Sequence, residues 1–311
     1  MKKNLAIAID LGASNLRIAL ISKTGKILKY SKTETPRKGN SGIIITKKII
    51  TLINSLLENQ PKKQIAGIGI SSIGPLDFKS GKILDSPNIP FKNVPLVSPL
   101  KKYFNLPVYL SNDCSAAVWG EKIFGVGRKY KNLVYVTISS GIGGGAIVDN
   151  HLLNGHTYNI AEIGHFIVDT RYNLLCGCKK GRGHWEGCCS GNNLPRFFKH
   201  WLKINGIKEK CPVKTSADIF ALAKKSNKTI LKFIEEIGLI NARGFSNIII
   251  AYNPEIIIVG GAVFLNNEKF ILPNIKKNID KYLVPPKIIA TPLKENITLL
   301  GAAALILFPP K

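Results

Sequence analysis

Runs of apolar residues alternate with short polar turns along the first half of the chain. Residues 4–9 predict a buried strand, and residues 16–22 predict a second strand after the polar turn 10–15. Isoleucine and leucine recur at helical spacing over 42–58, which predicts an amphipathic helix. The same pattern continues with strands at 65–70 and 107–110 and with helices at 94–104 and 115–124.

The opening pattern then recurs. Residues 133–138 predict a strand, 139–145 a glycine-rich turn and 146–150 a second strand. Two strand–turn–strand units about 130 residues apart predict two similar domains. The second half continues with helices near 191–203, 216–225, 228–252 and 299–308 and with a strand at 255–259. Strands that alternate with helices predict an α/β fold with mixed sheets.

Length and composition agree with a folded protein of two domains. The chain has 311 residues, of which 45% are hydrophobic, so intrinsic disorder is excluded. No run of about 18 apolar residues occurs, and the N-terminus lacks the apolar core of a signal peptide. We therefore expect a cytoplasmic protein with no membrane partner.

The formal net charge is +25, from 44 lysine and arginine residues against 19 acidic ones. The lysines are scattered in pairs, and no block of about five like charges occurs. This distribution favours a solvated lysine surface, so no nucleic acid is expected as a partner. A face that binds polyanions is the alternative.

Two turns rich in glycine and small hydroxyl residues each follow a predicted strand, at 12–15 and at 139–145. Glycine lets the backbone approach closely, and N–H and hydroxyl groups can then bind phosphate oxygens. Each turn alone fits an ordinary hairpin, but the pair, together with Gly260-Gly261 after a third strand, favours phosphate binding. Neither turn is a Walker A loop, and a strand rather than a helix follows the second, unlike a dinucleotide fingerprint.

Asn112-Asp113 stands where a predicted strand ends and a predicted helix begins. One interpretation is structural, with Asp113 as the helix N-cap. The other is catalytic, with Asp113 as a base that accepts the proton of a substrate hydroxyl during phosphoryl transfer. The residue alone does not decide between them.

Four of the six cysteines fall within 14 residues, which is unlike a disulfide framework. Four ligands suited to tetrahedral Zn²⁺ lie within 20 residues: His165, Cys176, Cys178 and His184. Cys188 or Cys189 can replace His184 as the fourth ligand, and unrelated free thiols in a polar loop are the alternative to a metal site. Glu162 and Glu186 flank the cluster, as expected of carboxylates that hold sugar hydroxyls.

Together these motifs resemble the ROK family of sugar kinases and sugar-responsive repressors, over nearly the whole chain. The cysteine segment departs from the commonest family pattern, C-x-C-G-x-x-G-C-x-E. Lys179 replaces the first glycine, His184 stands at the third cysteine, and the spacing is one residue longer. The segments that carry the resemblance are Asp10–Arg17, Gly67–Pro75, Ser86–Pro90, Asn112–Ala117, Thr137–Gly145, Glu162–His165 and Asn253–Gly261.

The resemblance implies an actin-like ATPase (ribonuclease H-like) fold, with two α/β domains around a central cleft. The smaller domain would comprise 1–115 plus 296–311, and the larger domain, with the zinc loop, 116–295. The implied activity is the ATP-dependent phosphorylation of a hexose, with Mg²⁺ as cofactor. Glucose, phosphorylated at O6, is the first expected substrate. The resemblance also implies a homodimer. Kinases for N-acetylated hexosamines or fructose are alternatives. A sugar-sensing regulator is another, although such proteins carry a DNA-binding segment before the first phosphate motif.

The resemblance also assigns roles to residues. Asp113 would be the catalytic base. The sugar would be bound by Ser72, Gly74, Asn88, Asn112, Asp113, Glu162, His165 and Glu186. ATP would be bound by Asp10, Gly12, Ala13, Ser14, Asn15, Ser140, Gly141, Gly143, Gly260 and Gly261. Structural zinc would be held by His165, Cys176, Cys178 and His184.

Overall fold

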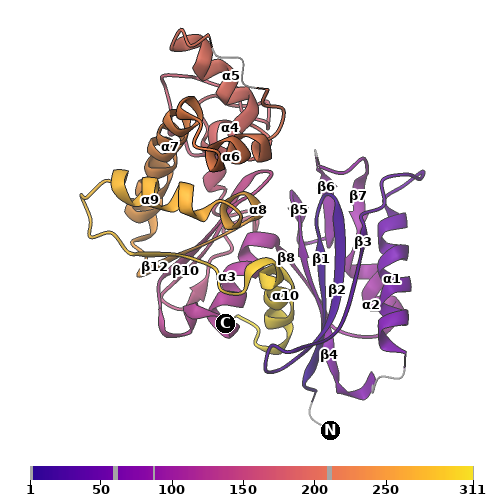
Figure 1. The fold of residues 1–311 in the computed structure, drawn as a ribbon. Coiled ribbons are helices and arrows are strands. Elements are labelled where there is room, and N and C mark those ends of the chain that lie inside the picture. Colours follow the sequence, from indigo (N-terminus) through magenta and orange to yellow (C-terminus); the bar gives the residue numbers. More distant parts are fainter. Residues whose placement is uncertain (1–2, 59–61, 87, 209–211, 311) are drawn as a thin grey trace. The chain divides into compact units, whose positions relative to one another are not determined.

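The computed structural model describes residues 3–58, 62–86, 88–208 and 212–310 of the chain (Figure 1). Pro87, in the segment expected beside the sugar, and Cys211 lie outside the described residues. The chain folds into two compact units. Unit 1 comprises Met1–Lys131, Gly145–Ile160 and Asn296–Lys311, and unit 2 comprises Asn132–Gly144 and Ala161–Glu295.

The main sheet of unit 1 contains five strands: β1 (Leu5–Leu11), β2 (Asn15–Ser22), β3 (Ile27–Glu34), β4 (Ile65–Ser72) and β8 (Val108–Asn112). Their order is β3-β2-β1-β4-β8. The first two pairings are antiparallel, and β1–β4 and β4–β8 are parallel. The carboxyl ends of β1, β4 and β8 therefore meet at one edge of the sheet.

The two faces of this sheet carry side chains of different size. On β1, Ile7 and Ile9 belong to the core that includes α1 (Ile43–Leu57), whereas alternate residues such as Ala8 face the other way. On that second face Gly69 pairs with Ala8, and α10 (Ile297–Leu307) packs against β1 and β4. Figure 1 shows α1 and α10 on opposite faces. Small residues on one face therefore let α10 approach the sheet closely.

Gly69→Ala tests this close approach. A Cβ at Gly69 would overlap the carbonyl oxygen of Ala302 in α10, so the helix must shift. We expect a loss of about 3 kcal/mol or more in the free energy of unfolding, measured by urea denaturation. Gly206→Ala is the control. Its Cβ meets nothing within 4 Å, and its φ of +64° leaves only a backbone strain of about 1–2 kcal/mol. Equal losses in the two variants would contradict the packing argument.

Further elements complete unit 1. α3 (Asp113–Phe124) packs on α10, and a Cβ at Gly301 would overlap the carbonyl oxygen of Ala116. This packing places α3 in unit 1, although the predicted larger domain begins at residue 116. The remaining elements are β5 (Leu76–Asp77), β6 (Lys82–Asp85), β7 (Lys92–Pro95), α2 (Val97–Phe104), β11 (His151–Leu152) and the 3-10 turns Lys62–Gln64 and Val126–Lys129.

The second sheet has the order β11-β10-β9-β12-β13. Its further strands are β9 (Leu133–Ile138), β10 (Ile142–Val148), β12 (Ile256–Gly260) and β13 (Lys287–Ala290), and β10 enters unit 1 at Gly145. β12 is parallel to both β9 and β13. The helices of unit 2 are α4 (Trp185–Cys189), α5 (Leu194–Ile204), α6 (Ser216–Lys224), α7 (Lys228–Tyr252), α8 (Ala262–Leu265) and α9 (Glu268–Asn278), with 3-10 turns at Ile163–His165 and Lys294–Asn296.

The observed bounds of two elements differ clearly from the predicted ones. The helix predicted at 94–104 begins only at Val97, because Lys92–Pro95 form β7 and pair with β6. The glycine turn predicted at 139–145 spans only its first residues, because β10 already begins at Ile142. In both places residues that also occur in helices or turns are held in strands by hairpin pairing with a strand close by in the chain, β7 with β6 and β10 with β11.

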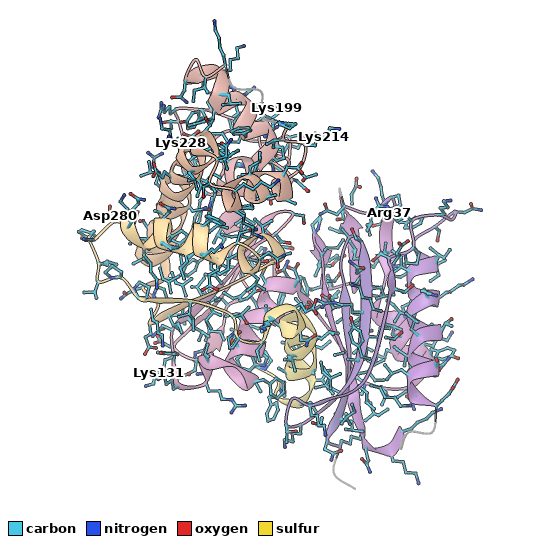
Figure 2. All side chains as sticks on the ribbon, viewed as in Figure 1. Arg37, Lys131, Lys199, Lys214, Lys228 and Asp280 are labelled. Atoms are coloured by element: carbon cyan, nitrogen blue, oxygen red, sulfur yellow. The ribbon has the colours of Figure 1, made fainter. Side chains whose placement is uncertain are left out.

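The charged residues lie mainly at the surface. Figure 2 labels Lys199, Lys214 and Lys228 on unit 2 and Lys131 on unit 1, and all four are exposed. None of the helices in the described part of the chain combines the length and apolar composition needed to cross a membrane.

Candidate functional site

The first glycine turn joins β1 to β2 in unit 1. The Gly12 N–H donates to the Asn15 carbonyl at 2.9 Å and closes the turn. Thr35, which is 2% exposed, supports it from outside: its hydroxyl donates to the Gly12 carbonyl at 2.8 Å and its N–H to the Ser14 carbonyl at 2.9 Å. These three hydrogen bonds therefore support the backbone of the turn.

Asp10, one residue before the end of β1, is held by an ion pair. Nε and Nη2 of Arg17 lie 2.8 and 2.7 Å from its Oδ2. Nη2 of Arg17 also donates to the Thr298 hydroxyl of α10 at 2.9 Å. Asp10 is only 8% exposed, so this pair ties the start of the turn to the C-terminal helix. Its expected role toward ATP and Mg²⁺ stays a prediction.

Asn112 and Asp113 connect β8 to α3. Asn112 is the N-cap, and its Oδ1 accepts the Cys114 N–H at 2.9 Å. Asp113 is the first residue of the helix, and its Oδ1 accepts the same N–H at 2.8 Å. The structural interpretation of Asp113 as the N-cap is therefore wrong, because Asn112 occupies that position.

The strand register brings these motifs to one edge of unit 1. Leu11 pairs with Ser72, and Ser72 pairs with Asn112, so the three parallel strands end side by side. A Cβ at Gly74 would lie 3.9 Å from the Asn112 Nδ2. In open α/β sheets ligands bind at the carboxyl ends of parallel strands. The predicted residues Gly12, Ser72, Gly74, Asn112 and Asp113 all belong to this edge.

The second glycine turn, Ser139–Gly141, lies in unit 2. The Ser139 N–H donates to the Gly141 carbonyl at 2.9 Å, and the Ser139 carbonyl accepts the Gly191 N–H at 2.7 Å. Gly260 pairs with Thr137, and a Cβ at Gly261 would overlap the Ile138 carbonyl. Unit 2 thus brings Ser140 and Gly141 near Gly260 and Gly261. Gly143 lies within β10, beyond the turn.

Glu186 contacts both this turn and the cysteine cluster. Its Oε2 accepts the Ile142 N–H at 3.0 Å, and its Oε1 lies 3.8 Å from the Cys176 Sγ. A Cβ at Gly141 would collide with the carboxylate. Sequence reasoning assigned Glu186 to the sugar only. Its bond to the turn was missed, because the two segments lie about 45 residues apart along the chain.

The four expected metal ligands form one cluster. Their ligand atoms, from His165, Cys176, Cys178 and His184, all lie within 4.8 Å of one another. The two His Nδ1 atoms are 3.2 Å apart, and Sγ–Nδ1 distances of 4.0 and 3.8 Å join Cys176 to His165 and Cys178 to His184. Around tetrahedral Zn²⁺, ligand atoms are roughly 3.3–3.8 Å apart. The donor set and its spacing therefore fit a four-coordinate ion.

Cys188 and Cys189 point elsewhere. Both are buried in α4, and the Cys189 Sγ lies 3.9 Å from the Ile237 carbonyl. Burial raises the pKa of Cys188 to about 12 and the pKa of Cys189 well above its usual value. Neither sulfur belongs to the group of ligand atoms that lie within 4.8 Å of one another. The geometry therefore selects His184 as the fourth member of the cluster.

Glu162 stands beside this cluster, next to its member His165. The His165 Nδ1 faces the other cluster ligands, while its Nε2 lies 3.9 Å from the Glu162 Oε2. Loss of solvent raises the pKa of Glu162, His165 opposes that shift, and the negative charge of Glu186 adds to it. The Glu162 side chain is still 56% exposed, so its carboxylate remains accessible to a ligand.

Comparison with known proteins identifies the family. The sequence profile of the ROK family matches residues 6–308. The chain belongs to the ROK family. The chain is 34% identical over 309 residues to the glucokinase of Pyrobaculum calidifontis, covering 98% of this chain and 96% of that one. It is 32% identical to the glucokinase of Thermotoga maritima, covering 98% of each.

A solved structure agrees. A ROK family glucokinase from Streptomyces griseus, in complex with glucose and AMPPNP, superposes with a TM-score of 0.77 at 28% identity, over 97% of this chain and 99% of that one. This ROK protein thus has the two-domain α/β fold of the actin-like ATPase type, and the fold prediction is confirmed.

Two residues of this ROK protein that position the site escaped sequence reasoning. Trp185 stands between His184 and Glu186, and its Nε1 donates to the Asn241 Oδ1 at 2.7 Å in the interior. A Cβ at Gly244 of α7 would overlap the Trp185 ring. The tryptophan therefore anchors α4 on α7. Its large apolar ring between two polar site residues is a signal in the sequence that could have found it.

Proposed function

We propose that this ROK protein is an ATP-dependent hexose kinase whose first substrate is glucose, phosphorylated at O6. The observation that carries the proposal is the edge of unit 1, where the turn of Gly12 lies beside Ser72 and Asn112-Asp113. A backbone turn suited to phosphate and a carboxylate suited to a hydroxyl there share one sheet edge. Membership in a family whose similar members are glucokinases supports the same activity.

Asp113 is proposed to accept the proton of the attacking hydroxyl. Because the Oδ1 of Asn112 is bound to the helix N–H of Cys114, its Nδ2 is directed away from the helix and toward Gly74. That amide can donate to a neighbouring sugar hydroxyl and so orient the acceptor oxygen for Asp113. Ser72 and Gly74 would border the sugar, and the segment around Asn88 would lie alongside.

The residues of unit 2 are proposed to hold the rest of the sugar and the nucleotide. Glu162, the Nε2 of His165 and the carboxylate of Glu186 would accept and donate hydrogen bonds with sugar hydroxyls. Ser140 and Gly141 would contact phosphate oxygens, and Gly260-Gly261 would border the nucleoside. Glu186 supports both tasks, because its bond to the Ile142 N–H fixes the turn beside it.

His165, Cys176, Cys178 and His184 are proposed to hold structural Zn²⁺. All four positions of a tetrahedral ion would be filled by protein, which is typical of structural rather than catalytic zinc. Bound zinc would order the segment between Cys176 and His184 and fix the ring of His165. Mg²⁺ is expected with ATP, where it neutralises charge on the β- and γ-phosphates.

The proposal is tested by incubating the purified protein with ATP, Mg²⁺ and single sugars while ADP is measured. The panel contains glucose, mannose, fructose, allose and N-acetylglucosamine. We expect the highest kcat/KM with glucose, and NMR of the product should show phosphate on O6. If no sugar raises ADP release above the rate without sugar, the kinase proposal fails. A cytoplasmic location and a homodimer stay predictions.

A further inference from the structure

Three consecutive carbonyls of the first glycine turn are held from one side. Thr35 donates from its hydroxyl to the Gly12 carbonyl and from its N–H to the Ser14 carbonyl. Nη1 of Arg37 donates to the carbonyl between them, that of Ala13, at 3.2 Å. All three donors come from the two residues Thr35 and Arg37, which follow β3.

This arrangement determines which way the N–H groups of the turn point. In a planar trans peptide the C=O of one residue and the N–H of the next point in opposite directions. Since the Gly12 and Ala13 carbonyls face Thr35 and Arg37, the N–H groups of Ala13 and Ser14 face the other way. Phosphate oxygens are attracted to N–H groups and repelled by carbonyl oxygens. Thr35 and Arg37 thus hold the carbonyl oxygens on their own side of the turn, so that N–H groups rather than carbonyl oxygens line the opposite side.

Arg37 also makes a second hydrogen bond, to the segment that is expected to border the sugar. The same Nη1 donates to the carbonyl of Asn88 at 3.1 Å. Asn88 lies in the segment 86–90, where its N–H lies 3.4 Å from the Ser86 hydroxyl and where Ile89 is buried in the core of unit 1. One nitrogen therefore joins the first glycine turn to the segment expected beside the sugar. Figure 2 labels Arg37 beyond the end of β3.

We propose that Arg37 is a positioning residue that couples the binding of sugar to the binding of ATP. The inference rests on the proposed kinase function and goes beyond it. A sugar bound against Asn88 holds the Asn88 carbonyl and thereby the guanidinium, and the guanidinium in turn fixes the Ala13 peptide in the orientation that phosphate requires. Its positive charge, beside the turn, favours the phosphates further.

The test measures the Kd of a non-hydrolysable ATP analogue by calorimetry, with and without a saturating concentration of the best hexose of the panel. We expect wild-type protein to bind the analogue about tenfold more tightly with sugar. The coupling ratio is the Kd of the analogue without sugar divided by its Kd with sugar. In Arg37→Ala this ratio should fall to about one, and the KM for ATP at saturating sugar should rise about tenfold. Arg37→Lys keeps a charged donor on a flexible stem and should retain part of the ratio.

Lys38→Ala is the matched control, because it removes the same charge one residue further along and should leave the ratio unchanged. A purely structural role for Arg37 would lower the melting temperature but not the ratio. The proposal is overturned if wild type shows no coupling, if Arg37→Ala keeps the wild-type ratio, or if Lys38→Ala loses it equally. Failure of the kinase proposal is separate, since it appears as absent ADP release by the wild type.

Discussion

Replacing Asp113 with asparagine should lower kcat by about 10²–10⁴-fold, the usual contribution of a positioned general base. Asparagine keeps an oxygen that can accept the Cys114 N–H, so the start of α3 should be preserved. It cannot take up the proton of the attacking hydroxyl. The KM for sugar should stay within a few-fold of wild type, because the hydrogen bonds that orient the sugar come mainly from other residues. Steady-state kinetics with glucose and ATP measure both quantities.

The neighbouring cap supplies the control for this prediction. Because Asn112 rather than Asp113 caps α3, Asn112→Ala should cost about 1 kcal/mol of unfolding free energy, whereas Asp113→Asn should leave stability nearly unchanged. A kcat for Asp113→Asn within tenfold of wild type would show that another group is the base.

The sequence predicted the fold correctly wherever the local pattern of apolar residues agrees with the pairing observed in the structure. Strands such as β1 and β4 are near-continuous apolar runs, and α1 has helical spacing, so their positions follow from periodicity alone. The pattern failed where hairpin pairing overrides the local preference of the residues. Val94 and Pro95 belong to β7, and Ile142 already starts β10 within a run of glycines. Their partner strands are close by in the chain, but proline in β7 and glycines in β10 are residue types that favour turns, so local propensity indicated the wrong element.

The site shows the same division. Residue types and spacing pointed to the cluster of cysteines and histidines, the glycine turns and Asn112-Asp113, because each carries a distinctive set of chemical groups; their roles stay predictions. Sequence could not choose between His184 and the two cysteines after it, since spacing gives distance along the chain and not direction. In the structure α4 turns Cys188 and Cys189 into the interior. The supporting residues Thr35, Arg37 and Asn241 carry no motif and became visible only through their contacts.

The second large effect is expected from loss of the metal. A zinc chelator at high concentration should remove the ion proposed at the cluster of His165, Cys176, Cys178 and His184, and should lower kcat/KM for glucose at least 100-fold. The reason is geometric. His165 contributes its Nδ1 to the cluster and directs its Nε2 toward Glu162. Cys176 contacts Glu186. A disordered cluster would therefore misplace both His165 and Glu186, which are proposed to bind the sugar. The melting temperature should fall by about 5 °C or more, given about 2–4 °C per kcal/mol in a domain of this size.

Three single substitutions decide whether the effect comes from this cluster. His184→Ala should lower the zinc content, measured by mass spectrometry, well below one per chain and reproduce the loss of activity. Cys188→Ala should keep one zinc and most of the activity, because the Cys188 sulfur is not one of the four clustered ligand atoms. Since His184 occupies the place of the third cysteine in the commoner ROK pattern, His184→Cys should restore zinc where His184→Ala loses it. Full zinc occupancy in His184→Ala would mean that the ion is held by a different set of ligands, and the proposed link between the cluster and the sugar-binding residues would have to be abandoned.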